Sequence, residues 1–147
     1  MTQKVPITEL ALVARDAAEL LRGPAALAGG DAAFFALSRL RRIDGPFSHI
    51  AFSHETSQLM DAIVTSLNTY PDAWENRHLG RCAEELTRFA KLAGLRQQQI
   101  RFFESSKVRR AMRHLTLAFV PRVSKVLPAP LAGICGALAR AQIRYSS

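Results

Sequence analysis

Apolar residues recur along this chain at intervals of three and four positions, which places them on one face of an α-helix. No segment alternates apolar and polar residues over the length of a half-buried strand. Glycine and proline divide the helical pattern into segments, because neither residue continues a helix well. The predicted helices span residues 9–21, 32–43, 53–70, 72–94, 97–120 and 131–145. We therefore expect an all-α protein of six to eight helices, organised as a single domain over residues 1–147.

Capping residues and corners set the expected helix limits. Thr8 is expected to cap the first helix and Asp31 the second, since both side chains can accept a hydrogen bond from a free backbone N–H. Residues 47–53 are expected to form a loop, and Gly80 to interrupt the fourth helix. The side chains expected to face a core are Phe34, Phe35, Leu37 and Leu40 in the second helix, Leu59, Met60, Ile63, Val64 and Leu67 in the third, and Leu79, Cys82, Ala83, Leu86, Phe89, Ala90 and Ala93 in the fourth.

The charge balance adds information about partners. Lysine and arginine number 20 against 12 acidic residues, which gives a formal net charge of +8. Such a charge favours anionic partners, namely nucleic acid, an acidic protein or a membrane surface. Apolar residues make up 48% of the chain, which is too high for a disordered protein.

Cysteine usage and the ends of the chain indicate the expected compartment. The two cysteines, Cys82 and Cys135, form neither a disulfide framework nor a CxxC motif, as is typical of a reduced, intracellular setting. The stretch MTQKVPITEL lacks the pattern of a secretion signal. The charge-free apolar stretch over 126–139 contains two prolines and is shorter than the ~20 residues of a membrane span. We expect a cytoplasmic protein with no membrane span.

The segment LTRFAKLAGL, residues 86–95, carries the residues of a family pattern. With Leu86, Arg88, Gly94 and Leu95 in register, it resembles the proximal helix of the globins, L-x-R-x-H-x-x-x-G-hydrophobic. The stretch QLMDAIVTSLNTY would then be the distal wall of the haem pocket, and two long helices would follow residue 96. The resemblance covers roughly residues 55–145 and is loose before them. It implies a globin-like bundle.

One departure from the globin pattern changes the expected chemistry. In this register the proximal histidine falls on Ala90, and a methyl group has no donor atom for haem iron. The resemblance therefore implies a haem-free member of the family, an interaction or sensory module that carries no oxygen. The residues expected to line its vestigial pocket are Gln58, Met60, Ile63, Leu86, Phe89 and Ala90. Large side chains could fill this pocket, or an apolar ligand such as a fatty acid could occupy it, because an empty apolar cavity destabilises a fold.

Other chemistry has weaker support in the sequence. The four histidines, His49, His54, His78 and His114, match no standard zinc spacing, so no metal site is expected. A globin that binds haem through His49, His54 or His78 stays open as an alternative. No GxSxG motif, P-loop or glycine-rich dinucleotide loop is present, and nothing in the sequence favours an enzyme.

A cluster of cations provides the best candidate for an external contact surface. Lys107, Arg109, Arg110 and Arg113 fall within two helical turns of KVRRAMRH. We expect this surface to bind a protein partner, and an acidic one would suit it. Binding of nucleic acid or another polyanion is the alternative, although no nucleic-acid-binding motif accompanies the cluster. The helix predicted over 131–145 is apolar most of the way round, which suits either a central helix or a homodimer through the last two helices.

Overall fold

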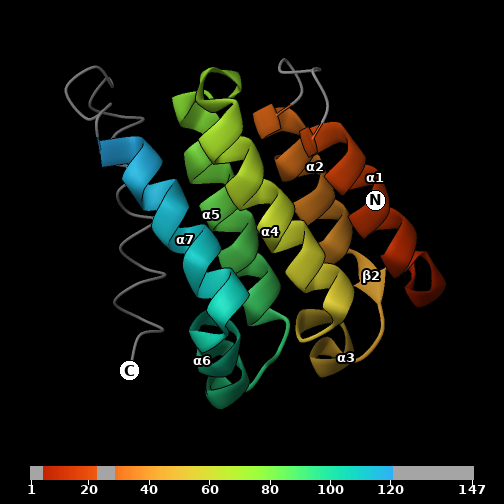
Figure 1. The fold of residues 1–147 in the computed structure, drawn as a ribbon. Coiled ribbons are helices and arrows are strands. Elements are labelled where there is room, and N and C mark those ends of the chain that lie inside the picture. Colours follow the sequence, from red (N-terminus) through yellow and green to blue (C-terminus); the bar gives the residue numbers. More distant parts are fainter. Residues whose placement is uncertain (1–4, 23–28, 121–147) are drawn as a thin grey trace.

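The computed structural model describes residues 5–22 and 29–120, and these form a helical bundle (Figure 1). The five longer helices are α1 (Leu10–Arg22), α2 (Gly29–Arg41), α4 (His54–Thr69), α5 (Asn76–Lys91) and α7 (Ser106–Phe119). Helix α4 packs between α1 and α7, and α5 packs against α2 behind them. The bundle therefore has two layers, α1–α4–α7 and α2–α5. The prediction of an all-α protein is confirmed.

Short elements connect the longer helices. Helix α3 (Phe47–Ala51) precedes α4, helix α6 (Arg96–Glu104) connects α5 to α7, and both lie at the lower end of the bundle in Figure 1. Two-residue strands, β1 (Val5–Pro6) and β2 (Ile43–Asp44), pair in parallel with Val5 opposite Ile43. Single 3-10 turns, η1 (Ile7–Glu9) and η3 (Pro71–Ala73), lead into α1 and connect α4 to α5.

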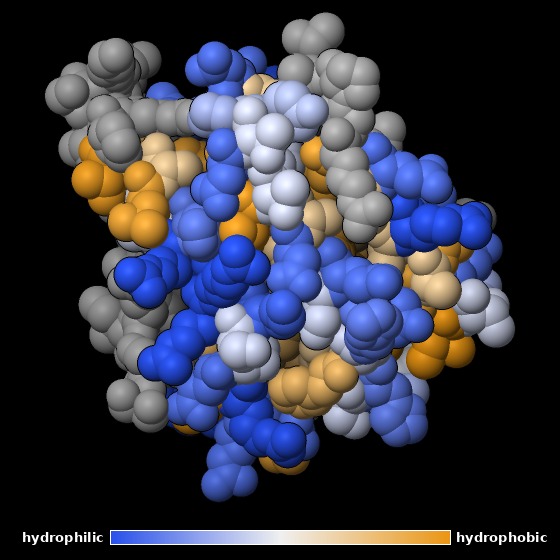
Figure 2. All heavy atoms as spheres, viewed as in Figure 1, coloured by the Kyte–Doolittle hydropathy of each residue, from blue (hydrophilic) through white to orange (hydrophobic). Residues whose placement is uncertain are grey.

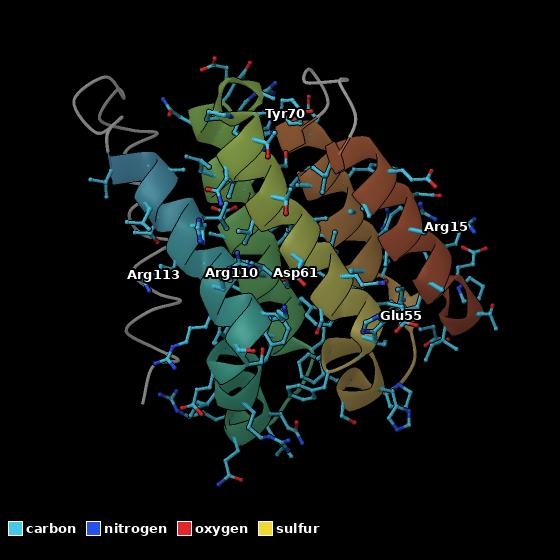
Figure 3. All side chains as sticks on the ribbon, in the orientation of Figure 1. Arg15, Glu55, Asp61, Tyr70, Arg110 and Arg113 are labelled. Carbon is cyan, nitrogen blue, oxygen red and sulfur yellow. The ribbon has the colours of Figure 1, made fainter. Side chains whose placement is uncertain are left out.

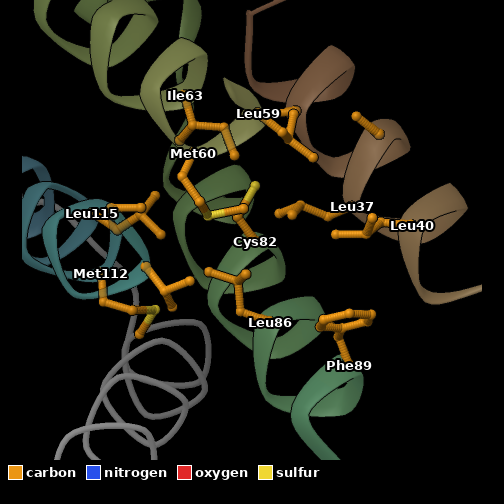
Figure 4. Packing of buried hydrophobic residues seen from close by; sticks show 14 of the residues in the cluster. Leu37, Leu40, Leu59, Met60, Ile63, Cys82, Leu86, Phe89, Met112 and Leu115 are labelled. Carbon is orange, nitrogen blue, oxygen red and sulfur yellow. The ribbon is translucent and has the colours of Figure 1, made fainter. Parts of the chain in front are cut away.

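The core lies between the two layers and is built from the predicted apolar stripes (Figure 4). All five predicted inward residues of α4 are buried. Six of the seven predicted for α5 are buried as well, while Ala93 is half-buried. Figure 4 shows Met60 of α4 among Cys82 and Leu86 of α5 and Leu115 of α7, so the layers interdigitate. Close packing of this kind leaves little free volume.

Several predicted helix limits are wrong, because contacts distant in sequence override the local signals. Thr8 lies inside η1 and caps no helix. Asp31 lies in the first turn of α2, and its carboxylate bonds a side chain of α5 instead. Residues 47–51 form α3, not a loop. Helix α5 continues through Gly80, which is buried.

The prediction of one long helix over 97–120 is also wrong. This part of the chain forms two helices, α6 and α7, which meet at Ser105. The Ser105 hydroxyl donates to the Phe102 carbonyl oxygen at 2.7 Å and so binds a carbonyl at the end of α6. The prediction that Phe35 faces the core is wrong, because the residue is 59% exposed. The guanidinium of Arg39 lies 6.0 Å from the centroid of its ring.

The helix predicted over 131–145 and Cys135 lie outside the described residues, and so does most of the surface expected to form a homodimer. Within the described part of the chain, every helix is too short or too polar to cross a bilayer.

Candidate functional site

Five of the six residues predicted to line a vestigial pocket belong to the buried core cluster. Met60, Ile63, Leu86 and Ala90 have no exposed surface, and Phe89 is 2% exposed. These side chains come from α4 and α5, the two helices that the globin resemblance assigned to the walls of a haem pocket. Gln58 is exposed at the surface of α4, so its assignment to this interior is wrong.

Aromatic rings fill the interior near the end of α5 that carries Ala90. The Phe89 ring lies 5.1 Å from the Phe47 ring and 5.2 Å from the Phe102 ring, measured between centroids. Phe102 contacts the ring of Phe103 at 5.3 Å. The Phe47–Phe89 rings are tilted by 38°, and Phe102 meets both of them edge-to-face, so the three rings join α3, α5 and α6.

A small surface pocket lies elsewhere, between the start of α4 and the junction of α6 with α7. Its lining includes Phe52, Thr56, Met60 and Lys107. Of the six residues predicted to line a vestigial haem pocket, only Met60 lines this surface pocket, so the two sites are different.

Three of the four histidines are exposed or half-buried. His49 and His54 are exposed near the start of α4. His114 is half-buried on α7. Among the described residues, no three histidine, cysteine or acidic side chains come close enough together to hold a metal ion.

His78 is the one buried histidine of the described residues, and both of its ring nitrogens are engaged. The Glu75 backbone N–H donates to Nδ1 at 2.9 Å, so Nδ1 is an acceptor and the proton sits on Nε2. Nε2 then donates to Asp31 Oδ1 at 2.9 Å. His78 thus completes the cap at the start of α5 and ties α5 to the first turn of α2. No lone pair remains for a metal ion.

The middle of α5 carries two further buried polar groups. Glu85 is 2% exposed, and its carboxylate accepts from Arg41 Nε at 2.8 Å and Arg88 Nη1 at 3.3 Å. Burial raises the pKa of the Cys82 thiol, and the Glu85 carboxylate raises it further. Cys82 therefore stays a protonated, unreactive thiol inside the core, as the sequence predicted for a buried small side chain.

The predicted basic surface lies on the outer side of α7 and is partly neutralised (Figure 3). Asp61 of α4 accepts from Lys107 Nζ at 3.0 Å and from Arg110 Nη1 at 3.5 Å. Arg109 and Arg113 are exposed and form no ion pair with any described residue. Figure 2 shows strongly hydrophilic side chains over the middle of α7 and the adjoining part of α4.

The sequence predicted the corner at Gly94 between α5 and α6, but not the exposed leucines on either side of it. Leu92 is 56% exposed and Leu95 is 67% exposed, the highest value for any large apolar side chain of the described residues. Gly94 between them has a φ of +73°. A signal was available, because the stretch 86–103 around this corner contains no acidic residue.

A comparison with protein-family models, with curated proteins and with solved structures found no match.

Proposed function

We propose that this chain is a haem-free, globin-like interaction module that binds an acidic protein partner through the outer face of α7. The observation that carries the proposal is the division of α7 into two faces. One face is packed in the core, with Val108, Ala111, Met112, Leu115 and Phe119 buried. The opposite face presents Arg109, Arg110 and Arg113 to solvent on a helix that is fixed from behind.

The haem-free part of the proposal is supported by the donor groups of the interior. Ala90 is buried and has no donor atom, and its neighbour Phe89 is occupied by ring contacts. His78 has both nitrogens engaged, and His49 and His54 face solvent. None of these residues offers a free donor nitrogen inside the bundle for haem iron.

An acidic protein fits the α7 face better than a nucleic acid does. Asp61 lies within the cationic surface and pairs with Lys107 and Arg110. A carboxylate at this position repels a continuous phosphate chain, whereas a protein partner can place its own cation or amide opposite Asp61. Arg109 and Arg113 are then the residues that contact acidic groups of the partner.

The test compares two variants that lose the same charge from different faces. R109Q/R113Q removes two arginines from α7, and the control R15Q/R81Q removes two exposed arginines from α1 and α5. Binding to polyglutamate and to single-stranded DNA is measured at several salt concentrations. We expect R109Q/R113Q to lose roughly tenfold in affinity for polyglutamate, and the control to lose less than about threefold.

Equal losses in both variants would show that binding follows net charge and not the α7 face. Tighter binding to DNA than to polyglutamate, with a steep loss at high salt, would favour the polyanion alternative.

A haemin titration tests the haem-free part separately. One equivalent of haemin added to the purified protein should give the absorption spectrum of free haemin, because Ala90 has no donor atom and His78 has both ring nitrogens engaged. A sharp, stoichiometric Soret band that disappears in H49A, H54A or H78A would contradict the proposal and identify the ligand.

A further inference from the structure

The corner between α5 and α6 exposes apolar surface at the lower end of the bundle (Figure 1). Leu92 and Leu95 are more than half exposed, and they lie on either side of Gly94. Isolated exposed leucines are common on protein surfaces. Two at one tip, both more than half exposed, are unusual enough to need a physical reason.

The charged residues within the corner and its two adjoining helical turns are all cations. Residues 86–103 contain Arg88, Lys91, Arg96 and Arg101 and no acidic residue. All four of these side chains are exposed. Of the acidic residues that flank the stretch, Glu85 is buried and bonded to Arg41 and Arg88, Glu84 is half-buried, and Glu104 is exposed at the far end of α6. The tip thus combines protruding apolar side chains with a positive surrounding field.

Hydrogen bonds and ring contacts hold the corner in shape. The N–H groups of Leu92, Ala93 and Gly94 donate to carbonyl oxygens three residues earlier, at 3.1, 3.1 and 3.3 Å. Behind the corner, Phe89 and Phe102 join α5 to α6. The leucines are therefore presented without a loop having to fold on binding, which removes an entropic penalty.

We propose that this corner docks on the surface of an anionic lipid bilayer, with Leu92 and Leu95 inserted at the interface and the cations near the headgroups. Apolar side chains flanked by lysine and arginine have this arrangement in proteins that lie on membranes without spanning them. Anionic headgroups complement the acid-free surroundings of the tip. A bilayer accepts protruding leucines without a matching pocket, whereas a protein partner would need a cleft shaped for both. The site is separate from the α7 face, so either proposal can fail alone.

Vesicle flotation tests the proposal with the full chain. Vesicles of phosphatidylcholine are compared with vesicles in which roughly one third of the lipid is phosphatidylserine. We expect binding to the anionic vesicles and at least about tenfold weaker binding to the neutral ones. L92S/L95S should reduce binding to anionic vesicles by about tenfold or more, because the inserted apolar surface is lost. L12S/L117S, which changes two exposed leucines on α1 and α7, is the matched control and should bind like the wild type.

Two further variants separate the contributions. K91Q/R96Q should lose most of the preference for anionic lipid, while R109Q/R113Q should keep it. Leu95→Trp places a reporter at the tip against the buried Trp74, which is 1% exposed, and its emission should shift to shorter wavelength on anionic vesicles. Circular dichroism confirms that each variant keeps its helical content.

Three results would overturn the proposal: no binding of the wild type to either vesicle, unchanged binding of L92S/L95S, or equal loss in L92S/L95S and L12S/L117S. If R109Q/R113Q lost binding to anionic vesicles and L92S/L95S kept it, the lipid contact would lie on α7 and not at the corner.

Discussion

The two ends of α5 differ in which side chains surround them and in how far these are buried. At its start, the backbone N–H of Glu75 is bonded by His78, whose ring is buried and also reaches Asp31 of α2. At its end, the chain turns through Gly94 and leaves Leu92 and Leu95 in solvent. The first end is closed by a buried imidazole, and the second leaves two apolar side chains in solvent.

A glycine belongs to each end, and each is required for a different physical reason. Gly30 of α2 lies directly against His78, and a Cβ there would overlap ring atoms Nδ1 and Cγ and lie 2.6 Å from the His78 Cβ. Gly94 has open space where a Cβ would be, with nothing within 4 Å, but its φ of +73° is unfavourable for other residues. Lack of space excludes a side chain at Gly30, whereas the backbone conformation disfavours one at Gly94. The start of α5, at His78 (the closed end), is therefore determined by packing against α2, whereas the end of α5, at Gly94 (the open end), is determined by a local turn.

The largest effect is expected at the closed end. Gly30→Ala should destabilise the protein by about 1–3 kcal/mol, because the new methyl group forces His78 or α2 to move. Alanine favours a helix over glycine, so the measured loss understates the overlap. Urea unfolding followed by circular dichroism measures the change in the free energy of unfolding.

A double-mutant cycle with His78→Ala tests the cause. Two of the three closest atoms belong to the imidazole ring, so Gly30→Ala should be less harmful in the His78→Ala background, by about 1 kcal/mol. If the free-energy changes of Gly30→Ala and His78→Ala were additive, the new methyl group would not be in contact with the imidazole ring. They would also weaken the view that His78 fixes the start of α5 against α2.

The sequence predicted the buried stripes well because they depend on local periodicity. Met60, Ile63, Leu86 and Ala90 are all buried as helical spacing requires. Gln58 failed because it was placed by its register in the globin pattern, while helical geometry turns it away from the stripe. The buried methyl at Ala90 was therefore predictable.

Other features have no local signal in the sequence. The bonds from His78 to Asp31 and from Arg41 to Glu85 join residues 47 and 44 positions apart. Nothing in either neighbourhood marks these pairs, so Asp31 was taken for a helix cap. The break at Ser105 contains neither glycine nor proline, so no local signal in the sequence marks the boundary between α6 and α7. The corner at Gly94 is the opposite case, since its glycine and its acid-free surroundings are visible in the sequence.

A smaller effect is expected at the open end. Gly94→Ala should destabilise the protein by about 1 kcal/mol, because a side chain raises the energy of the left-handed backbone at this position. Gly94→Asn is the matched comparison and should cost less, since asparagine adopts this conformation more readily than alanine does. Both values come from the same urea unfolding used for Gly30→Ala. Equal losses for alanine and asparagine would show that something other than φ determines the cost. If Gly94→Ala proved as harmful as Gly30→Ala, the corner would be part of the tertiary structure, and the contrast between the two ends of α5 would fail.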